Sequence, residues 1–125
     1  MYRQKDRSSL IVCLASVLEL DRPVHAVTEE RRGGERWNYD CCRAVEQWKV
    51  RPDGSQHCVL GHNTGGHWSF YDTETCTHIE VNGHEGQYRV WDYGGIHPLD
   101  VTFLDHTATL CEPASGHSKR FHVET

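Results

Sequence analysis

One short apolar run constrains the fold of this chain most. It covers residues 10–15, Leu-Ile-Val-Cys-Leu-Ala, close to the start of the 125 residues. Six apolar residues are far too few to cross a bilayer, which takes about 20 residues in a helix. Around the run, apolar side chains recur at spacings of three and four, the period of a helix with a buried face. They are Leu10, Cys13, Leu14, Val17 and Leu18. We therefore predict a helix that begins at Ser8 or Ser9, capped by a serine hydroxyl.

Two further short helices are expected in the first half of the chain. One is predicted over residues 24–30 and ends at the following Gly-Gly pair. The other is predicted over residues 39–48, where Cys42, Val45 and Trp48 recur at helical spacing. Residues 1–50 are therefore expected to be mainly helical.

From residue 55 onward the pattern becomes that of strands. Two candidate strands, 57–61 and 68–71, are separated by Asn-Thr-Gly-Gly, which is a hairpin signal. Helices followed by antiparallel strands make an α+β domain, here one domain over residues 1–125. Further strands are predicted at 78–81, 87–93, 101–104 and 119–123.

Composition and charge exclude several classes of function. The net charge is −5, and the 13 Lys and Arg residues are dispersed, so binding to nucleic acid through a basic surface is not expected. The basic N-terminus is not followed by the apolar stretch of a signal peptide, so we expect a cytoplasmic protein without a membrane partner. In that compartment the six cysteines are expected to be reduced thiols.

A separate group of residues has the composition of an acyl-transfer site. Such a site needs a nucleophile, a base, a group that orients the base, and donors for the oxyanion. Ser9 lies at the expected helix N-terminus, where free N–H groups and the helix dipole stabilise negative charge. The hairpin would place His57 beside Asp72, whose carboxylate would orient the imidazole. The Gln4 amide could donate to the oxyanion.

In order and spacing these residues resemble the papain-like cysteine peptidases. In that superfamily a Gln precedes the catalytic Cys by five residues, and a small residue or Cys follows it by four. The catalytic His opens a strand, and Asn or Asp ends the next strand after an aromatic segment. Gln4, Cys13, His57 and Asp72 match these positions, with the aromatic segment at 68–71. The pattern is similar to josephin-type deubiquitinases, to leader-cleaving peptidase domains of bacteriocin exporters, and to short papain-like proteins of phages and actinobacteria.

The resemblance implies a papain-like fold, with the N-terminal helix packed on an antiparallel sheet. It also implies a thiol protease that hydrolyses peptide or isopeptide bonds with a catalytic triad. One position departs from the family, because Ser9 stands where the nucleophilic Cys belongs. The thiolate is the nucleophile in such sites, so we expect an inactive form, either engineered or a natural pseudoenzyme. No metal or organic cofactor is implied, and the expected partner is a peptide or protein substrate.

Three alternatives remain open at this point. In a second catalytic register, His67 is the base and Asp92 its orienter. In a different class of function, a catalytically dead papain-like module keeps the cleft to bind a peptide or protein tail. The third alternative is a β-rich interaction protein in which the match at Ser9, His57 and Asp72 is accidental. It predicts that these three side chains do not come together.

Overall fold

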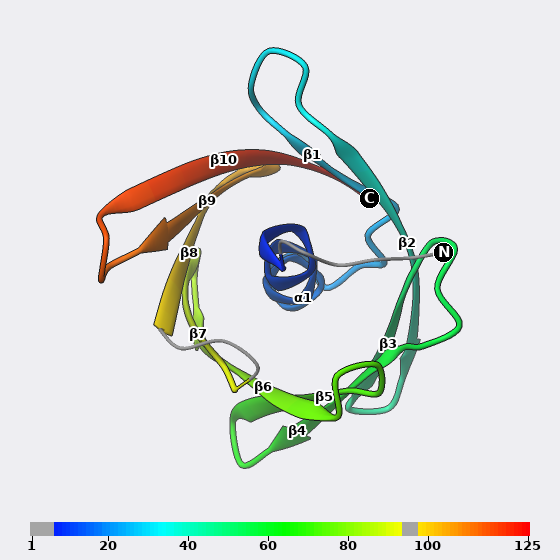
Figure 1. Ribbon diagram of the computed structural model, residues 1–125. Coiled ribbons are helices and arrows are strands. Elements are labelled where there is room, and N and C mark those ends of the chain that lie inside the picture. Colours follow the sequence, from blue (N-terminus) through cyan, green and yellow to red (C-terminus); the bar gives the residue numbers. More distant parts are fainter. Residues whose placement is uncertain (1–6, 94–97) are drawn as a thin grey trace.

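The apolar run lies in helix α1 (Ser8–Leu20), which occupies the middle of a closed antiparallel β-barrel (Figure 1). The structure is a computed structural model that describes residues 7–93 and 98–125. These residues form ten strands, which follow one another around the barrel in chain order. Their bounds are β1 (Ala26–Glu29), β2 (Arg36–Ala44), β3 (Gln47–Pro52), β4 (Val59–Thr64), β5 (His67–Asp72), β6 (Thr77–His84), β7 (Gln87–Asp92), β8 (Pro98–Leu104), β9 (Thr107–Glu112) and β10 (His117–Glu124).

Each strand pairs with its neighbours in the chain, and the barrel closes where β1 pairs with β10, Val27 opposite Val123. The connections differ between the two ends of the barrel. At the end where α1 finishes, two residues join β2 to β3, β4 to β5, β6 to β7 and β8 to β9. At the end where α1 begins, the connections between strands are longer. Because the sheet is closed, every strand pairs with a neighbouring strand on both sides.

Helix α1 is buried on every side. All its residues from Ser9 to Val17 are at most 3% exposed, as expected for a helix with apolar residues around its whole circumference. Along the strands, buried and exposed residues alternate, so that one face of each strand packs on the helix. The helix and the inward side chains together form the core of the barrel.

Two glycines leave room for the packing of the wall. A Cβ atom on Gly61 would lie 2.3 Å from the ring of Phe70, its partner on β5. Gly83 has φ +147°, and a Cβ atom there would lie 2.1 Å from the carbonyl oxygen of Gln87. Both positions therefore require glycine, the first for space and the second also for backbone conformation.

The expectation of a papain-like α+β fold is wrong. The segment expected to be helical at 24–30 contains β1, and the one at 39–48 contains most of β2 and the start of β3. In β2 the burial alternates, with Tyr39 and Cys41 inside and Asp40 and Cys42 outside. The helical spacing that ends at Trp48 is thus a coincidence within two alternating strands. The barrel surrounds α1, whereas a papain-like domain would pack its helix on one face of a sheet.

Other local predictions are confirmed. Helix α1 and the β4–β5 hairpin lie where the sequence predicts them, and so do the strands β6, β7, β8 and β10. The serine cap is wrong, because the residue that precedes the helix is Arg7 and no side chain caps the first turn. In the described part of the chain, no helix is both long enough and apolar enough to span a bilayer. All six cysteines are free thiols.

Candidate functional site

Arg7 holds two buried carboxylates at the start of α1. Its Nε donates to Asp92 Oδ2 at 2.5 Å, and its Nη1 donates to Asp72 Oδ2 at 2.9 Å. Asp72 is 3% exposed and Asp92 is 8% exposed. Burial lowers the pKa of the Arg7 guanidinium, but the hydrogen bonds and charges of Asp92 and Asp72 outweigh this effect and raise the pKa. The two candidate orienting carboxylates therefore belong to one ion cluster, and their shared partner is an arginine.

This cluster explains why the sequence offers two catalytic registers. Strand β5 ends in Phe70-Tyr71-Asp72 and β7 ends in Val90-Trp91-Asp92, so each strand has an apolar residue, an aromatic residue and Asp in the same order. In both strands the first and third residues are buried. Both Asp residues consequently reach Arg7 from neighbouring parts of the wall.

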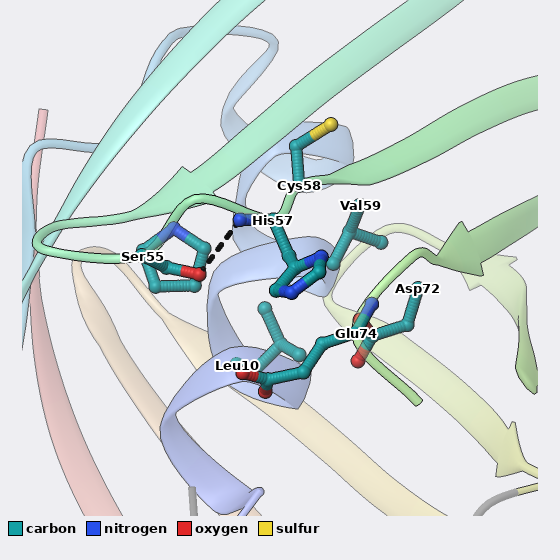
Figure 2. Close-up of a pocket in the computed structure, with 8 residues that line it drawn as sticks. Leu10, Ser55, His57, Cys58, Val59, Asp72 and Glu74 are labelled. Carbon is teal, nitrogen blue, oxygen red and sulfur yellow. Dashed lines mark hydrogen bonds between the residues drawn. The ribbon is translucent and has the colours of Figure 1, made fainter. Parts of the chain in front are cut away.

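His57 and Asp72 line the same small pocket, together with Leu10 and Glu74 (Figure 2). The backbone N–H of His57 donates to Ser55 Oγ at 3.0 Å. The pocket has a volume of about 10 Å³, which is the space of a single water molecule. The predicted base and its orienter are thus close in space, but the pocket between them cannot hold a peptide.

The predicted nucleophile faces another part of the wall. The Ser9 Oγ lies 2.8 Å from the Tyr39 hydroxyl on β2, and Ser9 is 3% exposed. This hydrogen bond fixes the hydroxyl between helix and barrel, where no substrate carbonyl can approach it. Gln4, the predicted oxyanion donor, lies outside the described residues.

The second register is spread over the length of the barrel. Strands β5 and β7 are both antiparallel to β6 and therefore run in the same direction. His67 begins β5 and Asp92 ends β7, so the two residues lie at opposite ends of the barrel wall. The His67 ring is 2.5 Å, Nδ1 to Oδ1, from Asn82 on the outside of the wall. Asp92 points inward to Arg7. The structure therefore does not bring His67 and Asp92 together.

Helix α1 is held at its other end as well. The Glu19 carboxylate accepts hydrogen bonds from the Tyr88 hydroxyl at 2.9 Å and from the Gly86 N–H at 3.0 Å. Burial, and then the hydrogen bond and charge of Glu19, raise the pKa of Tyr88. Charged side chains thus anchor both ends of the helix to the wall, which accounts for the Arg7 cluster in structural terms.

A second candidate site lies on the outside of β4 to β7. Here outward side chains form two parallel rows that cross the strands, and we call these eight residues the outer aromatic face. Backbone pairing defines the rows, including the hydrogen bond from the Tyr93 N–H to the His78 carbonyl. One row is Leu60, Tyr71, His78 and Tyr93, and the other is His62, Ser69, Glu80 and Trp91.

Large aromatic side chains are exposed on this face. Trp91 is 42% exposed and Tyr93 is 59% exposed. The rings of Tyr71 and His78 lie 5.1 Å apart, centre to centre. An exposed tryptophan and tyrosine on adjacent rows are a common mark of an interaction surface, because such side chains gain much by being covered.

Glu80 lies in the middle of the outer aromatic face. It is half-buried and pairs across the sheet with Ser69 on one side and Trp91 on the other. Elsewhere on the wall, Asp40 pairs with Arg51, Asp100 with Arg89, and Glu124 with Arg36. Within residues 7–93 and 98–125, no cation lies within ion-pairing distance of Glu80.

An apolar hollow adjoins this face. It has a volume of about 270 Å³ and is shared by strands β2, β3 and β4. Leu60 and His62 line it and also belong to the outer aromatic face, so the two features are continuous. At its edge the Arg43 guanidinium lies 5.7 Å from the centre of the Trp48 ring. The hollow has room for one large apolar side chain.

Comparison with protein-family models, with curated proteins and with solved structures yields no match. In the described part of the chain, no group of three His, Cys, Asp or Glu side chains is placed to hold a metal ion. The functional argument therefore depends on the residues of this chain alone. Sequence reasoning missed the outer aromatic face, although the alternation in 87–93 already separates Trp91 from the buried Val90.

Proposed function

We propose that this protein is a non-catalytic binding module that recognises a peptide segment of a partner protein through the outer aromatic face and its hollow. One observation supports the proposal most strongly: exposed Trp91 and Tyr93 lie on the same surface as the Leu60 hollow. This function corresponds to the β-rich interaction protein among the alternatives from the sequence. It keeps a peptide or protein as the partner.

The closed barrel determines how such a segment would bind. Many proteins bind peptides by adding a strand to a free sheet edge, whereas in this closed barrel every strand already pairs with a strand on both sides. The segment must therefore be recognised by side chains on the face. A hollow close to the lower limit of small-molecule pockets, about 300 Å³, can anchor one apolar side chain of that segment. Tryptophan and tyrosine beside it would supply most of the binding energy.

The hydrolase hypothesis has less support from the geometry. Asp72 is bound to Arg7, the pocket beside His57 has room for one water, and Ser9 is buried against Tyr39. A thiol introduced by Ser9→Cys is therefore expected to react with iodoacetamide no faster than the exposed native Cys42. Mass spectrometry of labelled peptides across pH measures this. Fast labelling at mildly acidic pH, lost in His57→Ala, would restore the hydrolase hypothesis.

Peptide selection tests the binding function directly. Random 12-residue peptides displayed on phage are selected on the immobilised protein, and the affinity of synthetic copies is measured by fluorescence polarisation. Leu60→Asp places a charge in the hollow and is expected to weaken binding about tenfold or more. The control is Ser118→Asp, which adds the same charge to the outside of β10, across the barrel from β5. Equal affinity of both variants, or no selected peptide at all, would overturn the proposal.

A further inference from the structure

Among the residues that the structure describes, the Glu80 carboxylate has no ion-pair partner, and this indicates which residue the partner segment carries. Glu80 is half-buried before any partner binds, and Trp91 flanks it directly on β7. A segment that covers the outer aromatic face removes more water from this carboxylate. Loss of hydration costs several kcal/mol for an ionised group unless a cation or hydrogen-bond donors replace the water. The segment must therefore bring a cation or hydrogen-bond donors to this position.

The neighbours of Glu80 favour one kind of cation. The planar guanidinium of arginine donates two parallel hydrogen bonds to a carboxylate and at the same time stacks on an aromatic ring. Trp91 is the best of the aromatic side chains for such a cation–π contact. The overall charge of −5 also attracts a basic partner over longer distances.

We propose that Glu80 and Trp91 form a recognition site for an arginine side chain of the partner segment. This inference rests on the proposed binding function and adds its charge specificity. The carboxylate binds the guanidinium, the indole covers its flat face, and the Ser69 hydroxyl on β5 lies beside the pair. The apolar anchor of the same segment occupies the hollow at Leu60, two strands away. Two strand spacings of about 4.8 Å and one row, or two residues at about 3.3 Å each, separate Leu60 from Glu80. The distance is therefore about 12 Å, which is about three to four residues of an extended peptide.

The pattern of selected peptides gives the first test. We expect arginine to be enriched about three to four residues from a large apolar residue. In the strongest peptide, arginine is then replaced by glutamine, and the affinity is measured for the unmodified protein and for Glu80→Gln. Each change alone is expected to weaken binding about tenfold, because it removes hydrogen bonds between two charged groups. Combining them should cause little further loss, because both remove the same contact.

Matched controls separate this inference from the proposal on which it rests. Glu85→Gln removes the same charge from the turn of the β6–β7 hairpin, away from the face, and should leave affinity within about twofold. Thermal unfolding confirms that each variant is folded. If peptides bind and Leu60→Asp weakens this binding, but Glu80→Gln has no effect, the arginine site is overturned and the binding module stands. If no peptide depends on Leu60, both are overturned.

Discussion

Carboxylates on the inner and outer sides of the barrel wall differ in burial and in whether the described chain places a cation beside them. Asp72 and Asp92 point inward, are almost fully buried, and share the guanidinium of Arg7. Glu80 points outward from the strand that lies between theirs, is half-buried, and has no cation beside it in the described chain. Inside, the chain itself supplies the compensating charge. Outside, we propose that a partner supplies it.

Adjacent residues take part in these two environments. Tyr71 and Asp72 follow one another on β5, as do Trp91 and Asp92 on β7. Because successive side chains of a strand point to opposite faces, the aromatic residue contributes to the outer face and the Asp to the ion cluster. One pair of strands thus provides both the anchor of the helix and the surface for a partner.

Loss of the inner cation is expected to have the largest effect on stability. Arg7→Met removes the cation that two buried carboxylates share, which should lower the free energy of unfolding by about 3–5 kcal/mol. Urea denaturation measures the loss. Adding Asp72→Asn and Asp92→Asn to this variant removes the uncompensated charges and should recover much of the stability. No recovery would show that Arg7 stabilises the barrel for another reason than these two charges.

Two alanine substitutions compare the inner side of β4 with its outer side. Gly61→Ala forces a Cβ atom against the buried Phe70 ring, which should cost about 1–3 kcal/mol. His62→Ala, one residue further on the outside, should change stability by less than about 0.5 kcal/mol. Urea denaturation of both variants provides the comparison. Similar values for the two would contradict the assigned register of β4.

The hydrogen bond of Tyr88 to Glu19, at the other end of the helix, predicts a loss of stability at alkaline pH. Tyr88 has a raised pKa in the folded chain, so the unfolded chain ionises first as pH increases. The stabilisation is fully present below about pH 10, the ordinary pKa of tyrosine, and is lost as pH rises toward the folded pKa. Unfolding measured between about pH 9 and 11 should show this decline, and Tyr88→Phe should reduce it. If stability declines equally in Tyr88→Phe and in the unmodified protein, ionisable groups other than Tyr88 cause the decline.

The smallest effect on stability is expected at Glu80. Glu80→Gln removes a charge that has no partner in the described chain, so thermal stability should change by less than about 0.5 kcal/mol. Peptide affinity should fall strongly in the same variant. Differential scanning fluorimetry measures the thermal stability of this variant, and fluorescence polarisation measures its peptide affinity. A large loss of stability would mean that Glu80 supports the fold.

The sequence predicts the local elements of this protein better than their assembly. The helix and the β4–β5 hairpin follow from apolar spacing and from Gly65-Gly66, because both signals are local. Closure of the barrel depends on β1 and β10, which pair from opposite parts of the chain, and no local pattern predicts that pairing. A prediction that does not include the closed barrel gives α1 one buried face, although the helix is buried on all sides.

The candidate site shows the same limit. His57 and Asp72 do come close, as the hairpin predicts. Their chemistry depends on Arg7, which belongs to the helix start and reaches Asp72 only because the helix lies inside the barrel. Trp91 and Glu80 are 11 positions apart in the sequence, and the backbone pairing makes them neighbours.

Backbone amide chemical shifts, recorded while a selected peptide is added, test the central claim most directly. The account predicts changes on the outside of β4 to β7, greatest around Leu60, Glu80 and Trp91, with few changes on β9 and β10. Changes centred instead on the pocket of His57, Asp72 and Glu74 would contradict it, because the binding site would then lie at the end of the barrel where α1 begins.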